Sequence, residues 1–175
     1  MINLENEKKQ WFPLCVKGRY ERKICDELTK RGFTVYLPLI KRRHLWSDRY
    51  KIIEEPLFSR YIFVHIDPRL KYFVLDVPGV QGFITFQGQM VHIPDFQIEY
   101  IQRMVEYPDT FEVINKIIKT GYKVRVISGP FCGMEGVVQS IKNKSRMYVT
   151  IDHIHHTLVI EVSEYDLELI KDGTS

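Results

Sequence analysis

The stretch Val124–Val138, VRVISGPFCGMEGVV, decides the fold of the second half of the chain. Short apolar runs flank a Gly-Pro turn at 129–130, and Gly133 and Gly136 can adopt backbone angles that are closed to residues with a Cβ. The pattern predicts two strands joined by a tight, preformed loop with Phe131 at its tip. We expect Phe131 to face outward and anchor a partner, because aromatic side chains on rigid loops dominate binding hot spots. The alternative is that Phe131 plugs one end of a small barrel.

The C-terminal part contains further short strands of the same kind. They are rich in β-branched and aromatic residues and are separated by turn-forming segments and a histidine-rich stretch. A set of strands this small and β-rich favours a little barrel. The predicted strands are Lys123–Ile127, Gly136–Ile141, Met147–Asp152 and Leu158–Val162.

The first part of the chain mixes strands and helices. Tyr61–Ile66, YIFVHI, has the clearest strand pattern. Ile62, Val64 and Ile66 would share one face, and Tyr61, Phe63 and His65 the other. From Arg19 to Arg31 apolar residues recur every four positions, which predicts a helix with Tyr20, Ile24 and Leu28 on its buried face.

The order of elements in this part is β-α-β-β-α-β with a trailing helix that Asp95 can cap and Pro108 ends. This order predicts an antiparallel sheet covered by helices on one face. Residues 41–51 form a polar, basic stretch with no strand predicted, and Pro13 is awkward inside the first apolar run. We therefore expect an α+β protein with one domain over residues 1–107, a linker over 108–117 and a β-rich domain over 118–175.

Composition indicates a folded protein, with 45% hydrophobic and 27% charged residues. No apolar run approaches the roughly 20 residues that a membrane span needs. The N-terminus MINLENEKKQW lacks the basic start and apolar stretch of a secretory signal. Cys15, Cys25 and Cys132 form no CxxC pair, so neither a disulfide framework nor a zinc ribbon is indicated. We expect a monomer in a reducing cytoplasm, without membrane contact.

Positive charge is concentrated in the first part. Residues 1–107 contain 17 Lys and Arg against 13 Asp and Glu, whereas residues 118–175 contain seven of each. A basic excess confined to one half fits a surface that faces nucleic acid, and the alternative is an ordinary soluble domain.

The stretch Gly121–Val138 resembles the KOW motif of NusG-type transcription factors, in which a glycine and a V-R-V strand precede G-P-F, a glycine and G-V-V. Tyr122 stands where the motif usually has an acidic residue. The first part is similar to the NusG N-terminal domain, because Trp11 opens the first strand, EEPLF at 54–58 leads into the strand at 61–64, and VPGV at 77–80 precedes Phe83. The resemblance covers nearly all of the chain and implies an N-terminal NusG domain followed by an SH3-like KOW barrel. The turn glycines of that barrel would be Gly121, Gly129, Gly133 and Gly136.

Within this family the chain resembles specialised members more than housekeeping ones. EEPLFSRYIFVHIDP at 54–68 is similar to RfaH, and Ser59-Arg60 replaces the Pro-Gly of NusG itself. KGRYERK at 17–23 and WSDRYK at 46–51 resemble UpxY-type antiterminators of polysaccharide operons. The resemblance implies a regulator that suppresses pausing or termination on one long operon. The alternatives are a housekeeping NusG-like elongation factor and a ribosome- or mRNA-associated RNA-binding KOW protein.

The resemblance implies that RNA polymerase binds an apolar patch formed by Phe58, Tyr61 and Phe63. The strand pattern agrees, because it places Tyr61 and Phe63 opposite the core face, where we expect them to be exposed. The first alternative is that further loops bury both faces. The second is an RNA-recognition module that stacks bases on the same rings, although its glycine-spaced signature is missing.

Basic residues and one tryptophan form the candidate nucleic-acid surface. Phosphates attract such charge, and Trp46 can stack on an unpaired base. The resemblance implies that this surface lies beside the non-template DNA strand, and the alternative is a solvated charged loop. The candidate residues are Lys17, Arg19, Lys41, Arg42, Arg43, Trp46, Arg49 and Lys51.

The resemblance also implies a partner surface on the KOW barrel, with Ile154 beside Phe131. A ribosomal protein or the Rho terminator binds this surface in the family, but here His155-His156 replaces a Gly-Arg pair. On a strand, His153 and His155 would share a face and could bind an ion, but no cysteine or carboxylate completes a set, so no metal is expected. No catalytic motif is present, and we expect neither enzymatic activity nor a cofactor.

Overall fold

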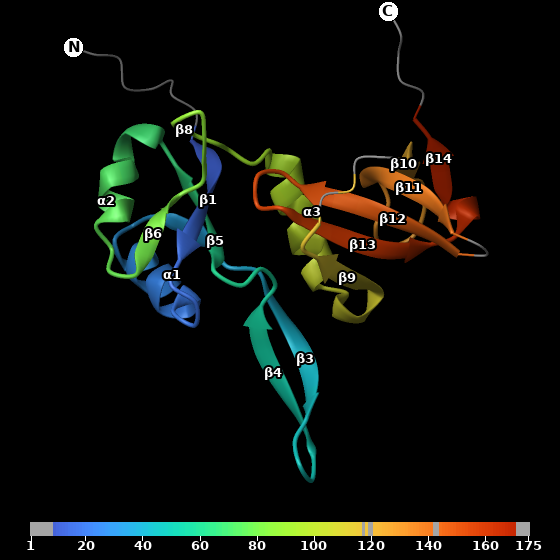
Figure 1. Cartoon of the computed structure of the whole chain (residues 1–175), viewed down its shortest axis with the longest axis horizontal. Coiled ribbons are helices and arrows are strands. Elements are labelled where there is room, and N and C mark those ends of the chain that lie inside the picture. The colour runs from blue at the N-terminus through green and yellow to red at the C-terminus, as the bar shows by residue number, and fades with distance from the viewer. Residues whose placement is uncertain (1–8, 117, 119–120, 142–143, 171–175) are drawn as a thin grey trace, which may run out of the picture. The chain divides into compact units, whose positions relative to one another are not determined.

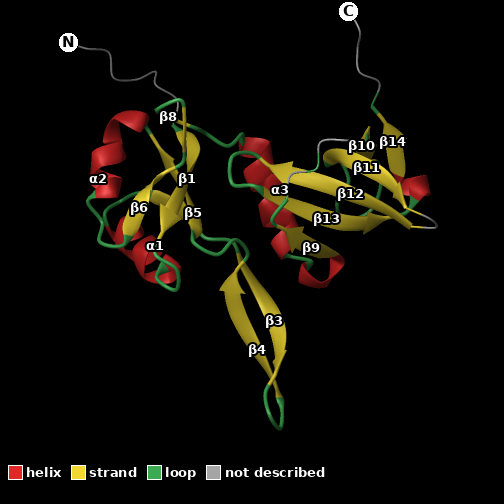
Figure 2. Ribbon diagram, in the orientation of Figure 1, coloured by secondary structure: helices red, strands yellow, loops and turns green. Residues whose placement is uncertain are grey.

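The computed structural model describes residues 9–116, 118, 121–141 and 144–170 of the chain. These residues form two compact units, Met1–Ile98 and Glu99–Ser175, each of which is described here by itself. The division falls inside helix α3 (Asp95–Val105), so the last turns of this helix belong to the second unit. Figure 1 labels the elements, and Figure 2 distinguishes the helices from the strands.

The first unit is built on a four-stranded antiparallel sheet with the order β2-β5-β1-β6. Its order along the chain matches the β-α-β-β-α-β pattern predicted from the sequence, with the β3–β4 and β7–β8 hairpins in addition. The elements are β1 (Gln10–Val16), α1 (Glu21–Lys30), β2 (Thr34–Tyr36), β3 (Leu39–Leu45), β4 (Tyr50–Pro56), β5 (Tyr61–Ile66), a 3-10 turn (Pro68–Leu70), α2 (Lys71–Leu75), β6 (Val80–Phe83), β7 (Thr85–Phe86) and β8 (Gln89–Met90).

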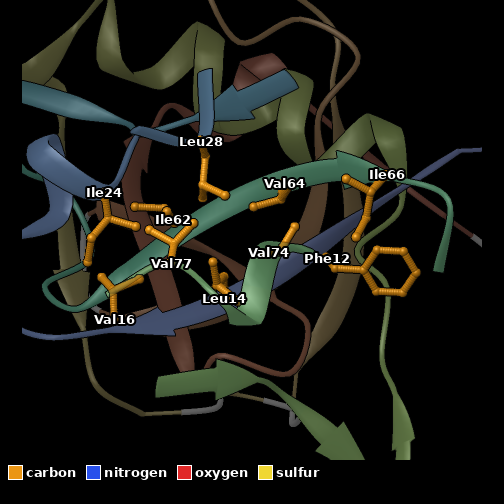
Figure 3. Close-up of a cluster of buried hydrophobic side chains, with 10 residues drawn as sticks. All are labelled: Phe12, Leu14, Val16, Ile24, Leu28, Ile62, Val64, Ile66, Val74 and Val77. Atoms are coloured by element: carbon orange, nitrogen blue, oxygen red, sulfur yellow. The ribbon is translucent and has the colours of Figure 1, made fainter. Parts of the chain in front are cut away.

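One face of this sheet forms the core, and helices α1 and α2 cover it (Figure 3). Alternate residues of β5 meet alternate residues of β1 on that face, as the period of two predicts. Fully burying one such aliphatic side chain contributes roughly 1.5–3 kcal/mol. The predicted cover of helices on one face is therefore confirmed. The buried cluster consists of Phe12, Leu14, Val16, Ile24, Leu28, Ile62, Val64, Ile66, Val74 and Val77.

Pro13 lies inside β1, although β1 is an inner strand of the sheet. Its carbonyl accepts a hydrogen bond from the N–H of Ile84, just beyond the end of β6. The nitrogen and carbonyl of one strand residue point to the same side, so the missing N–H of Pro13 faces the side on which β6 has already ended. The proline therefore costs the ladder little.

The start of α1 differs from the prediction. Tyr20 is exposed, whereas Glu21 is buried and its Oε1 accepts a hydrogen bond from the N–H of Arg60 at 2.9 Å. Arg60 has a φ of 70°, the left-handed region that favours glycine. A buried carboxylate thus holds the Ser59-Arg60 turn in a conformation that a Pro-Gly sequence would adopt without this help.

Residues 41–51 were expected to form a polar stretch without a strand, and this prediction is wrong. They belong to a long β3–β4 hairpin, in which Leu39 pairs with Pro56 and Leu45 with Tyr50. The hairpin projects away from the four-stranded sheet of the first unit (Figure 1). At its base, Arg22 of α1 contacts Glu54 at 2.6 Å.

The second unit is a six-stranded antiparallel sheet with the order β14-β10-β11-β12-β13-β9. All four strands predicted from the sequence are present, and the α+β fold class is confirmed. Part of the segment expected to be a linker is strand β9, which pairs with β13, and residue 117 of that segment lies outside the described residues. The strands are β9 (Phe111–Ile114), β10 (Tyr122–Val126), β11 (Glu135–Ile141), β12 (Lys144–Ile151), β13 (His156–Val162) and β14 (Leu167–Leu169), with 3-10 turns at Pro108–Thr110 and Glu164–Asp166.

Of the two glycines for which the sequence predicts special backbone angles, Gly133 has a positive φ and Gly136 does not. Gly129 and Gly133 adopt φ values of 77° and 87°. Gly136 is required for a different reason, because a Cβ there would lie 2.7 Å from the backbone oxygen of Tyr148.

We predict that Gly136→Ala destabilises the second unit by about 1–3 kcal/mol, because the added methyl group overpacks β11 against β12. Hydrogen exchange of amides in β12 should become faster. Gly18→Ala is the control, since its nearest heavy atom would be Cγ of Arg60 at 3.4 Å. Equal exchange in both variants would contradict the close approach at Gly136.

Candidate functional sites

The face of β5 opposite the core carries an aromatic cluster, which we define as Trp11, Tyr36, Phe58, Phe63 and His65. Its central ring, Phe63, lies 6.3 Å from Tyr36 and meets Phe58 edge-on at 6.1 Å. Trp11 lies 4.9 Å from His65. The sequence predicted that Phe63 and His65 share this face, but it did not identify Trp11 and Tyr36 as their neighbours.

Phe58 and Phe63 have 0% of their surface exposed, so the expectation that these rings are bare is wrong for this structure. The Tyr36 ring from β2 and the Phe58 ring from the turn before β5 pack against Phe63. Tyr61 is half-buried, and burial raises the pKa of its hydroxyl, so the phenol stays neutral at physiological pH. Of the three predicted polymerase contacts, Tyr61 is thus the accessible one.

A cleft of about 730 Å³ lies between α1 and the Val77–Gly79 turn. Lys17 and Tyr20 line it together with Lys23, and the ammonium groups of the two lysines lie 4.6 Å and 5.9 Å from the centre of the Tyr20 ring. An aromatic ring flanked by two cations can stack on a nucleic-acid base while the cations neutralise the neighbouring phosphates. Lys17 was predicted for this role, whereas Tyr20 was assigned to the helix core and Lys23 was not selected.

The remaining predicted nucleic-acid residues lie elsewhere. Arg19 is exposed in the β1–α1 loop with a φ of 68° and does not line the cleft. Lys41, Arg42, Arg43 and Lys51 lie on the strands of the β3–β4 hairpin, and Trp46 and Arg49 lie at its tip. The structure therefore divides the predicted surface into a cleft and a hairpin.

The hairpin cations are not equivalent. Arg42 forms an ion pair with Glu55 at 3.1 Å. The guanidinium of Arg43 lies over Tyr50 at 4.9 Å, and the ammonium of Lys51 lies over Trp46 at 5.3 Å. At the base, the hydrogen bond from Arg22 lowers the pKa of Glu54, so this carboxylate remains charged and holds the hairpin to α1 across the neutral range.

Phe131 is only 5% exposed, so its predicted outward position is wrong for this structure. Residues from the end of α3 and just beyond it contact the loop: Tyr107 meets Phe131 edge-on at 5.8 Å, and Arg103 donates a 2.6 Å hydrogen bond to the carbonyl of Cys132. The hydroxyl of Tyr100 also accepts from the N–H of Glu135 at 3.1 Å. The loop has its predicted shape, but its aromatic tip is covered by the segment that precedes the barrel.

Ile154 was expected on the surface beside Phe131, but it is also buried. It lies in the β12–β13 turn between His153 and His155, whose φ values are 66° and 56°. This turn geometry overturns the strand arrangement considered for a metal site. Burial lowers the pKa of the next residue, His156, which keeps it neutral near pH 7.

Within residues 9–116, 118, 121–141 and 144–170, no group of three or more His, Cys, Asp or Glu side chains could hold a metal ion. Cys15, Cys25 and Cys132 are free thiols. In the same part of the chain, no helix has both the length and the apolar character needed to cross a bilayer.

Residues 9–102 match the family model described as transcription termination factor NusG, and this match spans more than half of the 175 residues. The chain therefore belongs to the NusG family.

Full-length relatives agree with this assignment. The transcription termination/antitermination protein NusG of Lactococcus lactis is 25% identical over 181 residues, which cover 97% of each chain. NusG of Staphylococcus carnosus is 26% identical and covers 90% of this chain and 93% of its own length. A solved structure concerned with domain interaction in Thermotoga maritima NusG superposes with a TM-score of 0.55 at 25% identity, over 94% of this chain and 98% of that one.

We predict that Phe63→Ala lowers the free energy of unfolding by about 3–5 kcal/mol, because it leaves a cavity in the aromatic cluster. Phe86→Ala, at an exposed phenylalanine of the same unit, should change it by less than about 0.5 kcal/mol. Urea unfolding followed by tryptophan fluorescence measures both, because Trp11 belongs to the cluster. A small effect at Phe63 would show that this ring is not enclosed in solution.

Proposed function

We propose that this protein is a transcription elongation and antitermination regulator that binds RNA polymerase through the aromatic face of its first unit. The observation that carries the proposal is a sheet with its apolar core on one face and a separate set of aromatic rings on the other. Membership of the NusG family supports a role in transcription.

The predicted contacts are Phe58, Tyr61 and Phe63. Because Phe58 and Phe63 are fully buried, they must be uncovered before polymerase can contact them, and Tyr61 provides the first accessible contact. A protein that binds the elongating state of polymerase more tightly than the paused state shifts the equilibrium by that difference in affinity. Suppression of pausing then requires no catalytic group in this chain.

Nucleic-acid contacts would come from the cleft of α1 and the cations of the hairpin. Arg22 and Glu54 join the two elements, so the cleft and the hairpin base form one linked structure. We assign the non-template DNA strand to this surface, because an unpaired base can stack beside Tyr20 or Trp46 while lysines neutralise phosphates.

We further propose a specialised role on one long operon of the polysaccharide type, supported by the resemblance of 54–68 to RfaH and by the Arg60 turn that Glu21 holds. The KOW unit would recruit a second partner, a ribosomal protein or Rho, once Phe131 is uncovered. A general elongation factor is the second candidate, because the relatives at 25% and 26% identity are named as NusG. Transcript profiles after deletion separate the two: the specialised role predicts changes in one operon.

We predict that Tyr61→Ala weakens binding to RNA polymerase at least about tenfold, because an accessible aromatic anchor is lost. Tyr72→Ala is the matched control, since Tyr72 is an exposed tyrosine on α2, which covers the opposite, core face of the sheet. Biolayer interferometry of each full-length variant on immobilised polymerase measures the affinity. Equal affinities would remove the aromatic face from the proposal.

We predict that Lys17→Gln with Lys23→Gln reduces the salt dependence of binding to single-stranded DNA. Each lost phosphate contact should lower the slope of log K against log salt by about 0.7, so the pair should lower it by about 1.4. Lys9→Gln with Lys116→Gln removes the same charge at exposed positions outside the cleft. Fluorescence anisotropy across a salt series measures the slopes, and equal slopes would exclude the cleft from DNA binding.

A further inference from the structure

The β3–β4 hairpin has two faces of different chemistry. Its register pairs Leu45 with Tyr50 and Arg43 with Ile52, and side chains two residues apart on a strand share a face. We call these four residues the apolar face of the hairpin. Leu45, Tyr50 and Ile52 are 71%, 62% and 68% exposed, so nothing in the described part of the chain covers this face.

The opposite face carries mainly polar side chains, including Arg42, His44 and Glu55. Arg42 and Glu55 form an ion pair across the strands, and Ile53 between them is half-buried. Both faces belong to the same projecting hairpin, so the fact that the hairpin projects does not explain the difference between them. One side is mainly polar, and the other presents three large apolar side chains to solvent.

An uncovered apolar face on a two-stranded element is physically costly. A hairpin without a packed face is only marginally stable in water. This one is anchored at its base, where Ile40 is buried and the N–H of Leu57 donates to the carbonyl of Pro38 at 2.8 Å. Those contacts do not reach Leu45 or Tyr50 near the tip. Exposed apolar patches with a polar rim mark interaction sites, and this face has such a rim.

The rim carries more positive than negative charge, with one exposed carboxylate, Asp48, at the tip. Arg43 and Lys41 lie on the same face of the hairpin, and Arg49 lies at its tip. The carboxylate on this side, Glu54, is already held by Arg22 at 2.6 Å. A partner that complements this surface therefore carries carboxylates around apolar side chains.

That chemistry favours a protein over a nucleic acid. Nucleic-acid platforms stack bases on open aromatic rings. Here Arg43 already lies over the Tyr50 ring, and the two flanking side chains are aliphatic. Leu45 and Ile52 gain most from other apolar side chains, which a protein surface supplies.

We propose that the apolar face of the hairpin is a second protein-binding surface, which seats an acidic, apolar segment of RNA polymerase apart from the aromatic face of β5. The proposal rests on the proposed function, since it names the same partner. It assigns the exposed aliphatic residues to polymerase and leaves the α1 cleft to DNA.

The test uses the full-length protein and two probes: core RNA polymerase free of DNA and RNA, and a single-stranded DNA oligonucleotide. Leu45→Thr with Ile52→Thr removes the apolar contacts but keeps β-branched side chains in the strands. Arg43→Glu keeps the apolar residues and repels an acidic partner. Leu169→Thr with Ile127→Thr is the matched control, because these residues are exposed aliphatics of the second unit.

We expect both hairpin variants to bind core polymerase at least about tenfold more weakly, with an unchanged Tm and no effect in the control. The variant Leu45→Thr with Ile52→Thr removes no cation and should also keep its affinity for the oligonucleotide. Because Arg43 is itself a proposed nucleic-acid contact, Arg43→Glu is compared on core polymerase alone. Wild-type binding to polymerase with no loss in either hairpin variant would overturn this inference and leave the proposed function intact. A loss confined to the oligonucleotide would overturn it in favour of a nucleic-acid surface. Failure of the wild-type protein to bind polymerase would reject both proposals.

Discussion

The antiparallel pairing of β5 with β1 is the interaction on which the first unit depends. It places Ile62, Val64 and Ile66 against the helices and forces Phe63 and His65 to the other side of the sheet. Because side chains alternate strictly along a strand, the same short stretch of sequence supplies residues to both the core and the aromatic cluster. A shift of the register by one residue would exchange the two sets and destroy both.

The candidate sites of this unit lie around that sheet rather than in a single pocket. The aromatic cluster, the α1 cleft and the hairpin each use a different physical property: buried rings, cations around a tyrosine, and exposed aliphatic side chains. The ion pair between Arg22 and Glu54 connects the last two. An isolated exposed ion pair stabilises little, so its importance here is geometric, since it directs the base of the hairpin relative to α1.

In the second unit, the shape of the loop at 129–134 and the exposure of its Phe131 side chain have different causes. Glycine conformations set the shape, and these are local properties of the chain. Whether Phe131 is available to a partner depends instead on Arg103 and Tyr107, which lie more than twenty residues earlier and were not part of the loop pattern. The same separation applies to Ile154, which the resemblance placed on the surface but which is buried within the turn that His153 and His155 form.

By itself, the sequence determined the β-α-β-β-α-β order around the first sheet, the two faces of β5, the shape of the loop at 129–134 and the family, because each of these is a local pattern of period, turn chemistry or motif. The sequence did not predict the β3–β4 hairpin, because residues 41–51 are mostly polar and show no strand pattern by themselves. The two faces of the hairpin become apparent only when the cross-strand pairs are known. Tertiary structure alone decided that Phe58, Phe63 and Phe131 are covered while Leu45 and Ile52 are not. Burial depends on which distant segments pack against a side chain, and that is a property of the folded chain rather than of any one stretch.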